Sequence, residues 1–315
     1  MAQYDLVVVG AGVAGLCAAA GAAGQGLKVL VVEAIGAGGQ VMNVDRIDNF
    51  PGFPHAISGY ELGPLLQEQA ETAGAEFLLD SIEALQVSGQ ELLLVGGEGT
   101  ISALAVVLAA GSAKRQLGVP GEERLQGRGV SHCASCDGPL FKKLDACVVG
   151  GGDAALDEAL ALARHASRVT LIHRGPAFSA RQSLVERVAA AGNIETLFDT
   201  EVEEIFGAAN VSGVALRDVG SGARRQQKTD GVFIYVGLAP RTAFLAGALR
   251  LDGDGHVETD IMLRTSLAGV FAAGDIRAGS VAQLAAAAGD GATAAIAAWR
   301  YIKVLREALH LQENP

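Results

Sequence analysis

Near its amino end the chain carries the run Leu6-Val7-Val8-Val9-Gly10-Ala11-Gly12-Val13-Ala14-Gly15, in which apolar residues pass directly into the pattern G-x-G-x-x-G. A continuous apolar run predicts a strand buried on both faces, as in a parallel sheet. The Ala-rich residues 16–23 then predict a helix, and residues 28–32 predict a second strand that ends on Glu33. This order of strand, glycine turn, helix, strand and acid is typical of a dinucleotide-binding βαβ unit.

The residue types in this pattern suit the binding of a nucleotide. Glycines such as Gly10, Gly12 and Gly15 supply the backbone angles of a tight turn and the absent side chain that a pyrophosphate needs. The amino end of the following helix offers N–H groups and a partial positive charge to the phosphates. Glu33 stands where a carboxylate accepts hydrogen bonds from a ribose diol. A tight turn without a ligand is the alternative, and the complete βαβ context disfavours it.

A second copy of the unit lies 140 residues further on, counted from Gly10 to Gly150. Residues 146–149 predict a strand, and 156–165 and 168–173 predict the next helix and strand. The turn between them reads Gly150-Gly151-Gly152-Asp153-Ala154-Ala155 and matches G-x-G-x-x-A. The repeat predicts an α/β fold with two Rossmann-like, three-layer domains.

The second turn has no acid at the end of its second strand. Gly150, Gly152 and Ala155 are the candidate contacts to a pyridine nucleotide, and His173-Arg174 takes the place of the acid. A cation there can accept a 2′-phosphate, so Arg174 favours NADP over NAD. A solvated surface arginine is the alternative for this residue.

Composition narrows the function classes. The chain has 315 residues, 50% of them hydrophobic and 19% charged, which excludes a disordered chain and suggests two domains. Its formal net charge is -11, which works against nucleic-acid binding. The longest uncharged stretch, residues 6–27, is punctuated by glycines and fits strand, turn and helix better than a membrane span. The amino end has no basic region, so we expect no signal peptide and a cytoplasmic location.

The chemistry is concentrated in Cys133-Ala134-Ser135-Cys136-Asp137. Two cysteines at this spacing can close a small disulfide ring, and in a reducing compartment they indicate redox chemistry. The adjacent Asp137 can pass a proton to a leaving thiolate. A zinc site needs a second pair of ligands, and Cys17 and Cys147 each stand alone in a predicted helix and strand, so we expect no metal. A reduced, inert pair is the alternative.

At these residues the chain resembles the low-molecular-weight, bacterial-type thioredoxin reductases. The similar segments run nearly from end to end. They are Gly38-Gly39-Gln40, Asn49-Phe50-Pro51-Gly52, Gly127-Arg128-Gly129-Val130-Ser131 followed by Cys133-Ala134-Ser135-Cys136-Asp137-Gly138, and Phe271-Ala272-Ala273-Gly274-Asp275. Two further segments depart from the family's A-T-G-A and R-Q-A motifs and read here Ala109-Ala110-Gly111-Ser112 and Ala282-Gln283-Leu284.

The resemblance implies a homodimeric flavoenzyme that reduces thioredoxin or a similar dithiol protein. It implies an FAD domain built from residues 1–114 and 245–315, with a pyridine-nucleotide domain, residues 115–244, inserted into it. The inserted domain carries the cysteines: Cys136 exchanges electrons with the flavin, Cys133 attacks the thioredoxin disulfide, and Asp137 is the acid. The FAD residues so implied are Gly10, Gly12, Gly15, Glu33, Gly39, Gln40, Asn49, Gly111, Gly274, Asp275 and Gln283.

The chain departs from the family where NADPH would bind. The family signature H-R-R-x-x-F-R-A reads here His173-Arg174-Gly175-Pro176-Ala177-Phe178-Ser179-Ala180, so two of three arginines are absent, which argues against tight NADPH binding. A neighbouring Arg181 is a candidate replacement. The pattern resembles divergent branches of the family, some of which take electrons from ferredoxin, so the donor is left open.

Further alternatives follow from these departures. Ala282 stands where the family has an arginine, and the chain extends beyond the usual carboxyl end, where it either covers the flavin face or frays. A redox-sensing flavoprotein without efficient turnover is a second function, and a ferredoxin–NADP reductase of the same fold is a third. Arg115, Arg124 and Arg128 are candidates for a basic docking patch, with scattered surface charge as the alternative.

Overall fold

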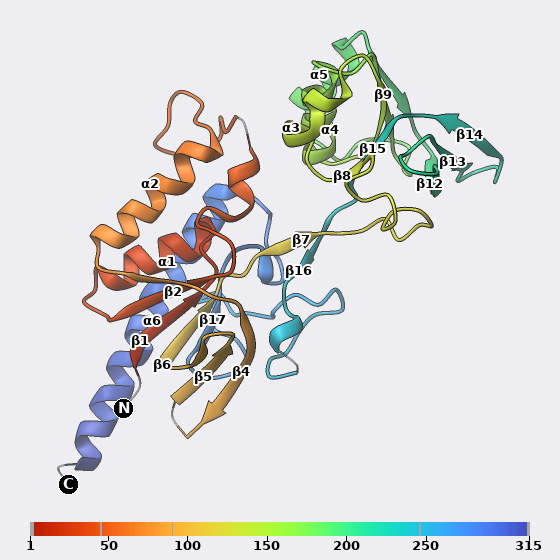
Figure 1. Ribbon diagram of the computed structural model, residues 1–315. Helices are drawn as coiled ribbons and strands as arrows, with labels where there is room; N and C mark the ends of the chain where they lie inside the picture. The colour runs from red at the N-terminus through yellow and green to blue at the C-terminus, as the bar shows by residue number, and fades with distance from the viewer. Residues whose placement is uncertain (1–2, 45, 90, 246, 314–315) are drawn as a thin grey trace. The chain divides into compact units, whose positions relative to one another are not determined.

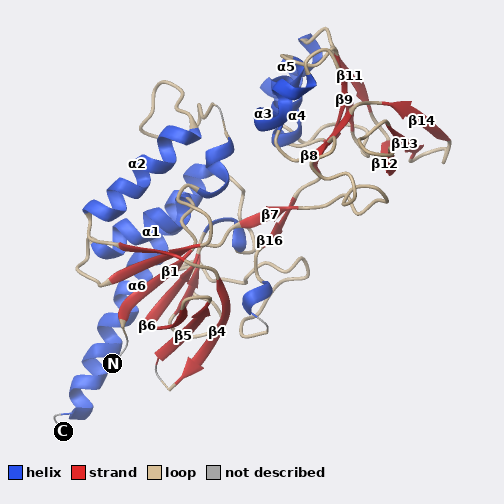
Figure 2. Cartoon of the chain, viewed as in Figure 1, coloured by secondary structure: helices blue, strands red, loops and turns tan. Residues whose placement is uncertain are grey.

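The structure is a computed structural model that describes residues 3–44, 46–89, 91–245 and 247–313 (Figures 1 and 2). The chain divides into unit 1, Met1–Ala113 with Ala239–Pro315, and unit 2, Lys114–Leu238, so unit 2 is inserted into unit 1. The chain returns to unit 1 at Ala239, earlier than the expected residue 245. The reason is that residues before 245 already contact unit 1: the Arg241 N–H donates to the Gly111 carbonyl oxygen at 3.0 Å, and Phe244 packs against the core of this unit.

Unit 1 is built on a seven-stranded sheet in the order β3-β2-β1-β6-β5-β4, with β17 also paired to β6. Strands β1, β2, β3, β6 and β17 are mutually parallel, and β4 and β5 continue the sheet as an antiparallel hairpin. The bounds are β1 Tyr4–Val9, β2 Val29–Glu33, β3 Glu76–Leu79, β4 Ile82–Ser88, β5 Glu91–Gly96, β6 Gly99–Leu108 and β17 Val270–Ala272.

The apolar run at the start of the chain supplies the core on both faces of this sheet. Leu6 and Val8 pack with the helices α1 (Val13–Ala23), α2 (Gly59–Thr72) and α6 (Leu284–Glu313). Val7 and Val9 face the opposite side, where they join the apolar residues of β4, β5 and β17. This alternation explains why the run shows no polar residue, and it confirms the predicted buried parallel strand.

Helices α1 and α6 lie side by side, as their close contacts show. A Cβ on Gly291 would lie 2.2 Å from the Ala14 carbonyl oxygen, and one on Gly21 would lie 3.1 Å from Ala295 Cβ. Small residues therefore let the two backbones approach. No helix in the described part of the chain is long and apolar enough to cross a membrane.

Unit 2 repeats the arrangement on a smaller scale. Its parallel sheet has the order β11-β10-β9-β15-β8 and is accompanied by α3, α4 and α5. The bounds are β8 Val130–Ser131, α3 Ala134–Asp137, β9 Asp145–Gly150, α4 Asp153–Ala163, β10 Arg168–Ile172, α5 Gln182–Ala190, β11 Ile194–Leu197 and β15 Gly231–Tyr235. The repeated βαβ unit and the α/β fold class are thus confirmed.

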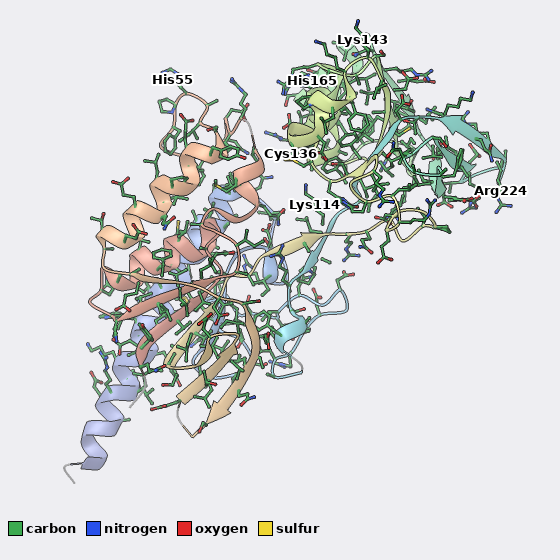
Figure 3. All side chains as sticks on the ribbon, viewed as in Figure 1. His55, Lys114, Cys136, Lys143, His165 and Arg224 are labelled. Carbon is green, nitrogen blue, oxygen red and sulfur yellow. A yellow bond between two sulfur atoms is a disulfide. The ribbon has the colours of Figure 1, made fainter. Side chains whose placement is uncertain are left out.

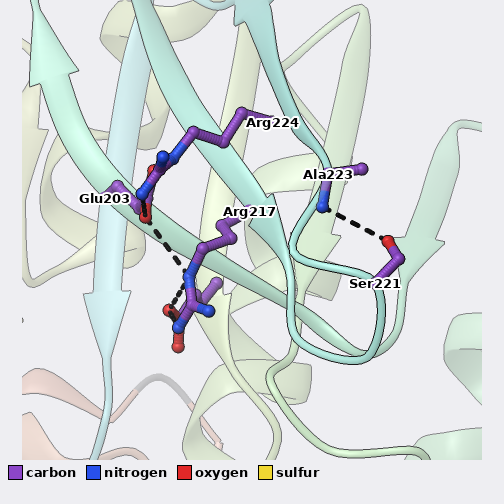
Figure 4. A network of polar contacts seen from close by, with 6 residues as sticks. Glu203, Arg217, Ser221, Ala223 and Arg224 are labelled. Carbon is purple, nitrogen blue, oxygen red and sulfur yellow. Dashed lines mark hydrogen bonds and ion pairs between the residues drawn. The ribbon is translucent and has the colours of Figure 1, made fainter.

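A three-stranded antiparallel sheet, β12 (Thr200–Phe206), β13 (Gly213–Asp218) and β14 (Arg224–Lys228), covers the other face of the unit 2 core. Its surface carries a chain of ion pairs, in which Arg217 contacts Glu201 and Glu203, and Glu203 also contacts Arg224 with an N–O distance of 2.7 Å (Figure 4). Arg224 holds the pKa of Glu203 below its usual value. These partly exposed pairs join the three strands of the sheet, and each contributes little to stability because water screens its charges.

The remaining elements are short. The two chain crossings, β7 (Ser112–Lys114) and β16 (Leu238–Pro240), form a two-stranded sheet. The 3₁₀ helices are η1 Gly39–Asn43, η2 Gly138–Phe141, η3 Ala243–Leu245 and η4 Gly274–Ile276.

Candidate active site

The first glycine turn connects β1 to α1 in unit 1, and its geometry requires glycine at two positions. Gly10 has φ +103°, and a Cβ there would lie 2.4 Å from the Ala109 carbonyl oxygen. A Cβ on Gly15 would lie 1.9 Å from the Gly10 carbonyl oxygen. Gly12 differs, because nothing lies within 4 Å of its Cβ position. The turn is therefore closed by Gly10 and Gly15 and open at Gly12, beside the amino end of α1.

Glu33, at the carboxyl end of β2, closes the same turn. One of its carboxylate oxygens accepts the Ala11 N–H at 2.7 Å, and the other accepts the Ile35 N–H at 3.0 Å. The Gly38 N–H donates to the Ala11 carbonyl oxygen at 2.7 Å, and Gly39 lies against Gly12. The structure thus brings the acid and the predicted flavin loop to the glycine turn.

A second group of predicted residues is joined through Ser112. The Gln40 side-chain amide donates to the Ser112 carbonyl oxygen at 2.9 Å, and the Ser112 hydroxyl donates to the Asp275 carbonyl oxygen at 2.8 Å. The Asp275 carboxylate accepts from the Ser280 hydroxyl at 3.0 Å. Gly111, with φ +65°, has nothing within 4 Å of its Cβ position. Segments from both ends of the chain therefore meet here.

Asn49 and Gln283 form a third pair, in which the Asn49 amide donates to Gln283 Oε1 at 3.1 Å. Ala282, which stands in place of the family's arginine, has a φ of +50°, a strained angle for a residue with a Cβ. Ala282 therefore adopts this backbone conformation, but it lacks the positive charge of the arginine that the family has at this position.

Sequence reasoning missed Asp290 and Arg277, which support the Gly274 turn. The Asp290 carboxylate accepts the Gly274 N–H at 3.0 Å and pairs with both ends of the Arg277 guanidinium at 2.6 and 3.0 Å. A Cβ on Gly274 would lie 2.9 Å from Ala14 Cβ, so α1 also depends on this glycine. Asp290 lies sixteen residues beyond Gly274, with no sequence motif to connect them.

These residues fit a dinucleotide such as FAD. The Gly12 backbone is open at the amino end of α1, where a phosphate can approach it. The Glu33 carboxylate lies at the end of the neighbouring strand β2, where a ribose can reach it. Both features lie at the carboxyl ends of parallel strands, where open α/β sheets bind their ligands.

Cys133 and Cys136 are joined in a disulfide bond with a Cα–Cα distance of 5.3 Å. Cys133 caps the amino end of α3 and accepts the Cys136 N–H on its Sγ at 3.2 Å. Cys136 is exposed and Cys133 is half-buried. The predicted pair is therefore close enough to cycle between disulfide and dithiol.

Asp137 follows the pair directly and is held by Ser131, which belongs to a motif quoted above but was given no role from the sequence. The Ser131 hydroxyl, which is buried, donates to Asp137 Oδ2 at 2.6 Å and accepts the Cys133 N–H at 3.1 Å. The carboxylate is thereby tied to the backbone of the first cysteine. Ser131 lies in β8, so a strand of the unit 2 sheet positions both groups.

The second glycine turn, between β9 and α4, also requires its glycines. Gly150 has φ +151°, and a Cβ there would lie 2.3 Å from the Tyr235 carbonyl oxygen and 2.8 Å from Ala155 Cβ. A Cβ on Gly151 would lie 2.3 Å from the His173 ring. Gly152 is more open, with Ser179 Oγ the nearest atom at 3.8 Å. Gly150, Gly152 and Ala155 are thus brought together as predicted.

Two arginines follow the second strand of this unit, Arg174 and Arg181. Arg174 is exposed. Arg181 pairs with Asp153, at the first residue of α4, with an N–O distance of 2.7 Å. Its charge is therefore partly neutralised, so it is a poor replacement for the absent arginines. The ring of His173 instead packs with Phe178 and Phe198.

The other two cysteines do not join the pair. Cys147 is buried in β9, where burial raises its pKa to about 12. Cys17 is half-buried in α1, and burial raises its pKa as well. Among the described residues no cluster of three or more His, Cys, Asp or Glu side chains is arranged to hold a metal.

Comparison with known proteins identifies the family. A model described as pyridine nucleotide-disulphide oxidoreductase matches residues 4–291. The thioredoxin reductase of Treponema pallidum is 41% identical over 96% of this chain and 99% of its own length. The chain belongs to the thioredoxin reductase family. The Mycolicibacterium smegmatis thioredoxin reductase is 43% identical over 95% of this chain and 96% of its own.

Solved thioredoxin reductases share the fold. The Lactococcus lactis enzyme has a TM-score of 0.94 at 34% identity and covers 96% of this chain and 100% of its own. Membership of the thioredoxin reductase family makes this chain an FAD-dependent disulfide reductase, as the sequence predicts.

The carboxyl-terminal extension of this thioredoxin reductase homologue runs away from the first glycine turn. Helix α6 runs past the start of β1 toward the end of the chain (Figure 1). On this part of α6 the Arg306 guanidinium pairs with the carboxylate of Asp5, the second residue of β1. The glycine turn follows the opposite end of β1. As far as Arg306, the extension therefore does not cover the residues predicted to hold the flavin.

The three candidate arginines of the docking patch are all exposed. Arg115 donates to the Leu238 carbonyl oxygen at 2.6 Å and Arg124 to the Ala208 carbonyl oxygen at 3.1 Å. These hydrogen bonds leave the positive charge of both guanidiniums in place, so the basic docking patch stays a prediction.

Proposed function

We propose that this chain reduces the disulfide of a thioredoxin-type protein through its Cys133–Cys136 pair. The observation that carries the proposal is the closed disulfide with Asp137 beside it, tied through Ser131 to the Cys133 backbone. A disulfide at the amino end of the short α3 helix, where Cys133 is the capping residue, suits thiol–disulfide exchange with another protein. The names of the relatives add support for the substrate class.

In this proposal unit 1 holds FAD. Gly10, Gly12 and Gly15 form the turn that accepts the pyrophosphate, and Glu33 accepts the ribose hydroxyls. The rest of the FAD site is lined by Gly39, Gln40, Asn49, Gly111, Gly274, Asp275 and Gln283. The hydrogen bonds from Gln40 to Ser112, from Ser112 to Asp275 and from Asn49 to Gln283 support this grouping. The bound flavin supplies a hydride acceptor that passes electron pairs to a disulfide.

The roles of the cysteines follow the same proposal. Cys136 receives the electron pair, the S–S bond opens, and Cys133 then attacks the substrate disulfide as a thiolate. Asp137 gives its proton to the thiolate that leaves, because the Ser131 hydroxyl holds its carboxyl group next to the pair.

The donor in this proposal is a reduced pyridine nucleotide held by Gly150, Gly152 and Ala155 of unit 2. Arg174 is the cation offered to a 2′-phosphate, and Arg181 is engaged by Asp153. With Arg174 as the one family arginine retained and Arg181 paired to Asp153, we expect only a modest preference for NADPH over NADH. A reduced ferredoxin is the competing donor.

Anaerobic titration separates the donors. The FAD-loaded protein is mixed in turn with NADPH, NADH and reduced ferredoxin, and the flavin absorbance is followed. Bleaching by both nucleotides at similar concentrations supports the proposal. Bleaching by ferredoxin alone would show that ferredoxin, not a pyridine nucleotide, is the donor. Slow bleaching by every donor would support a redox-sensing flavoprotein instead.

Substrate reduction is tested with oxidised thioredoxin and the flavin-reduced protein. We expect new thiols on thioredoxin with the wild type and none with Cys136→Ser or Cys133→Ser, while all three bind FAD. A variant with wild-type thiol production would contradict the proposal. A homodimer and a cytoplasmic location complete the proposal; the dimer is tested by light scattering of the FAD-loaded protein.

A further inference from the structure

The backbone N–H of Ala134, the first residue after Cys133, is held by two side chains of unit 2. It lies 3.0 Å from Glu158 Oε2 and 3.0 Å from the Tyr235 hydroxyl oxygen. Glu158 comes from α4, and Tyr235 ends β15 with its side chain buried. Two elements distant in sequence therefore converge on one amide of the disulfide loop.

Lys114 completes this group. Its ammonium donates to the carbonyl oxygen of His132, the residue before Cys133, and lies 5.2 Å from the centre of the Tyr235 ring. Figure 3 labels Lys114 and Cys136, the exposed member of the pair. We call these three side chains the Lys114–Glu158–Tyr235 cluster.

The charges of the cluster act on one another. Burial raises the pKa of Tyr235, and the charges of Glu158 and Asp137 raise it further, so the phenol keeps its proton. Burial lowers the pKa of Lys114, and the charge of Glu158 opposes that shift. The carboxylate of Glu158 therefore acts electrostatically on both of the other members of the cluster, Tyr235 and Lys114.

The position of Glu158 bears on the redox pair. When the disulfide opens, Cys133 carries negative charge as a thiolate, and nearby N–H groups stabilise such a charge. The Cys136 N–H already points at Cys133 Sγ, at 3.2 Å. The Ala134 N–H points at a carboxylate instead, which places a second negative charge one residue from the sulfur. A carboxylate bound to the amide of the next residue disfavours the thiolate, because like charges repel.

We propose that Glu158 is a positioning residue for the redox pair, which holds the Ala134 amide with a charged oxygen and thereby makes the dithiol a stronger reductant. Reduction breaks the S–S bond with one electron pair from the flavin and two protons, giving two thiols, or with one proton where Cys133 remains a thiolate. Because Glu158 disfavours that thiolate, it shifts the balance toward the disulfide and favours transfer of the electron pair to the substrate. The inference rests on the proposed exchange at Cys133 and Cys136.

The test compares the redox equilibrium of the pair in the full-length, FAD-loaded protein. The wild type, Glu158→Gln and Asp157→Asn are equilibrated in glutathione buffers of graded ratio, and the dithiol fraction is counted by alkylation and mass spectrometry. Asp157→Asn is the matched control, since Asp157 is the exposed neighbour on α4, 3.9 Å from Arg187. Glutamine keeps the shape and the acceptor oxygen of Glu158 and removes only the charge.

We expect Glu158→Gln to shift the equilibrium roughly tenfold toward the dithiol, which corresponds to about 30 mV. The pH profile of Cys133 alkylation should move to lower pH in the same variant, because removal of the negative charge of Glu158 favours the Cys133 thiolate. A purely structural role of Glu158 would not lower the pKa of this thiol. Tyr235→Phe retains the ring and the charge of Glu158, so its equilibrium should stay within about twofold of the wild type.

Three results would overturn the inference. They are a folded Glu158→Gln protein whose equilibrium and alkylation profile match the wild type, an equal shift in Asp157→Asn, or a shift toward the disulfide. The measurement needs neither thioredoxin nor an electron donor. If the wild type fails to reduce thioredoxin while Glu158→Gln still shifts the equilibrium, the proposed function falls and the inference about Glu158 stands.

Discussion

Asp137 is placed by Ser131, whose hydroxyl bridges the carboxylate and the Cys133 backbone. If Asp137 supplies the proton to the leaving thiolate, Asp137→Asn should lower kcat for disulfide reduction about a hundredfold, within the usual range for a general acid. The flavin content should be unchanged, since Asp137 belongs to unit 2. Steady-state turnover with thioredoxin measures the effect.

Ser131→Ala provides the control for this prediction. It removes the hydrogen bond that orients Asp137 but leaves the carboxyl group, so the loss of turnover should be smaller than in Asp137→Asn. Turnover of Asp137→Asn within threefold of the wild type would show that another group supplies the proton.

Cys147 should react differently from the redox pair because burial raises its pKa to about 12. At pH 9 its thiolate fraction is on the order of a thousandth, so iodoacetamide should alkylate Cys133 and Cys136 in the reduced protein well before Cys147. Peptide mass spectrometry at successive times measures the order. Early labelling of Cys147 in folded protein would contradict its burial.

The same raised pKa links Cys147 to stability. Between pH 9 and 12 the Cys147 thiol keeps its proton in the folded chain and loses it in the unfolded chain. The contribution of this thiol to the free energy of unfolding is therefore complete below pH 9 and falls as the pH rises above 9. From pH 8 to 10 the free energy of unfolding should fall by about 1 kcal/mol more in the wild type than in Cys147→Ala. Urea denaturation at both pH values measures this difference, and parallel changes in the two proteins would contradict it.

At the scale of the element, substitutions at two glycines of the first glycine turn should have different effects, one on folding and the other on FAD binding. Gly15→Ala forces a Cβ to within 1.9 Å of the Gly10 carbonyl oxygen, so we expect it to destabilise the apoprotein by about 2 kcal/mol or more. Gly12→Ala meets nothing within 4 Å and has an ordinary φ of -75°, so the apoprotein should fold normally and bind FAD more weakly.

Thermal melting of the apoprotein and FAD titration measure the two effects independently. Equal FAD affinity in Gly12→Ala and the wild type would show that the phosphates do not approach this backbone.

The elements that the sequence predicted are those with a local signal. The βαβ units at Gly10 and Gly150 repeat one pattern of apolar run, glycine turn and helix, and both occur where predicted. Helix α2 also had a signal, the capping box of Ser58 and Glu61, which the sequence analysis passed over.

Other parts of the site have no local signal. Glu158 and Tyr235 meet the amide of Ala134 only because α4, β15 and α3 come together in the folded unit. Asp290 likewise reaches Gly274 from α6. Such contacts depend on tertiary packing, which residue types and spacing in one sequence do not specify.

At the scale of the molecule, the insertion of unit 2 makes a prediction about independent folding. The Arg241 N–H donates to the Gly111 carbonyl oxygen at 3.0 Å, so the two ends of unit 1 lie close together at the crossing. Joining Ala113 to Ala239 through a short glycine linker should therefore give a folded protein that binds FAD and reduces nothing.

The matched experiment expresses residues 114–238 alone. This unit has its own buried core and should fold with the disulfide intact and without flavin. Absorbance spectra and circular dichroism of both pieces measure the outcome. A soluble unit 1 that binds no FAD, together with a unit 2 that does, would contradict the assignment of the cofactor.

The central claim is that the disulfide accepts electrons from the bound flavin, and anaerobic reductive titration tests it most directly. The FAD-loaded wild type should take up two electron pairs per chain, one for the flavin and one for the disulfide, and Cys136→Ser should take up one. Equal uptake by the two proteins, with the wild-type disulfide still closed after the flavin is fully reduced, would contradict the account.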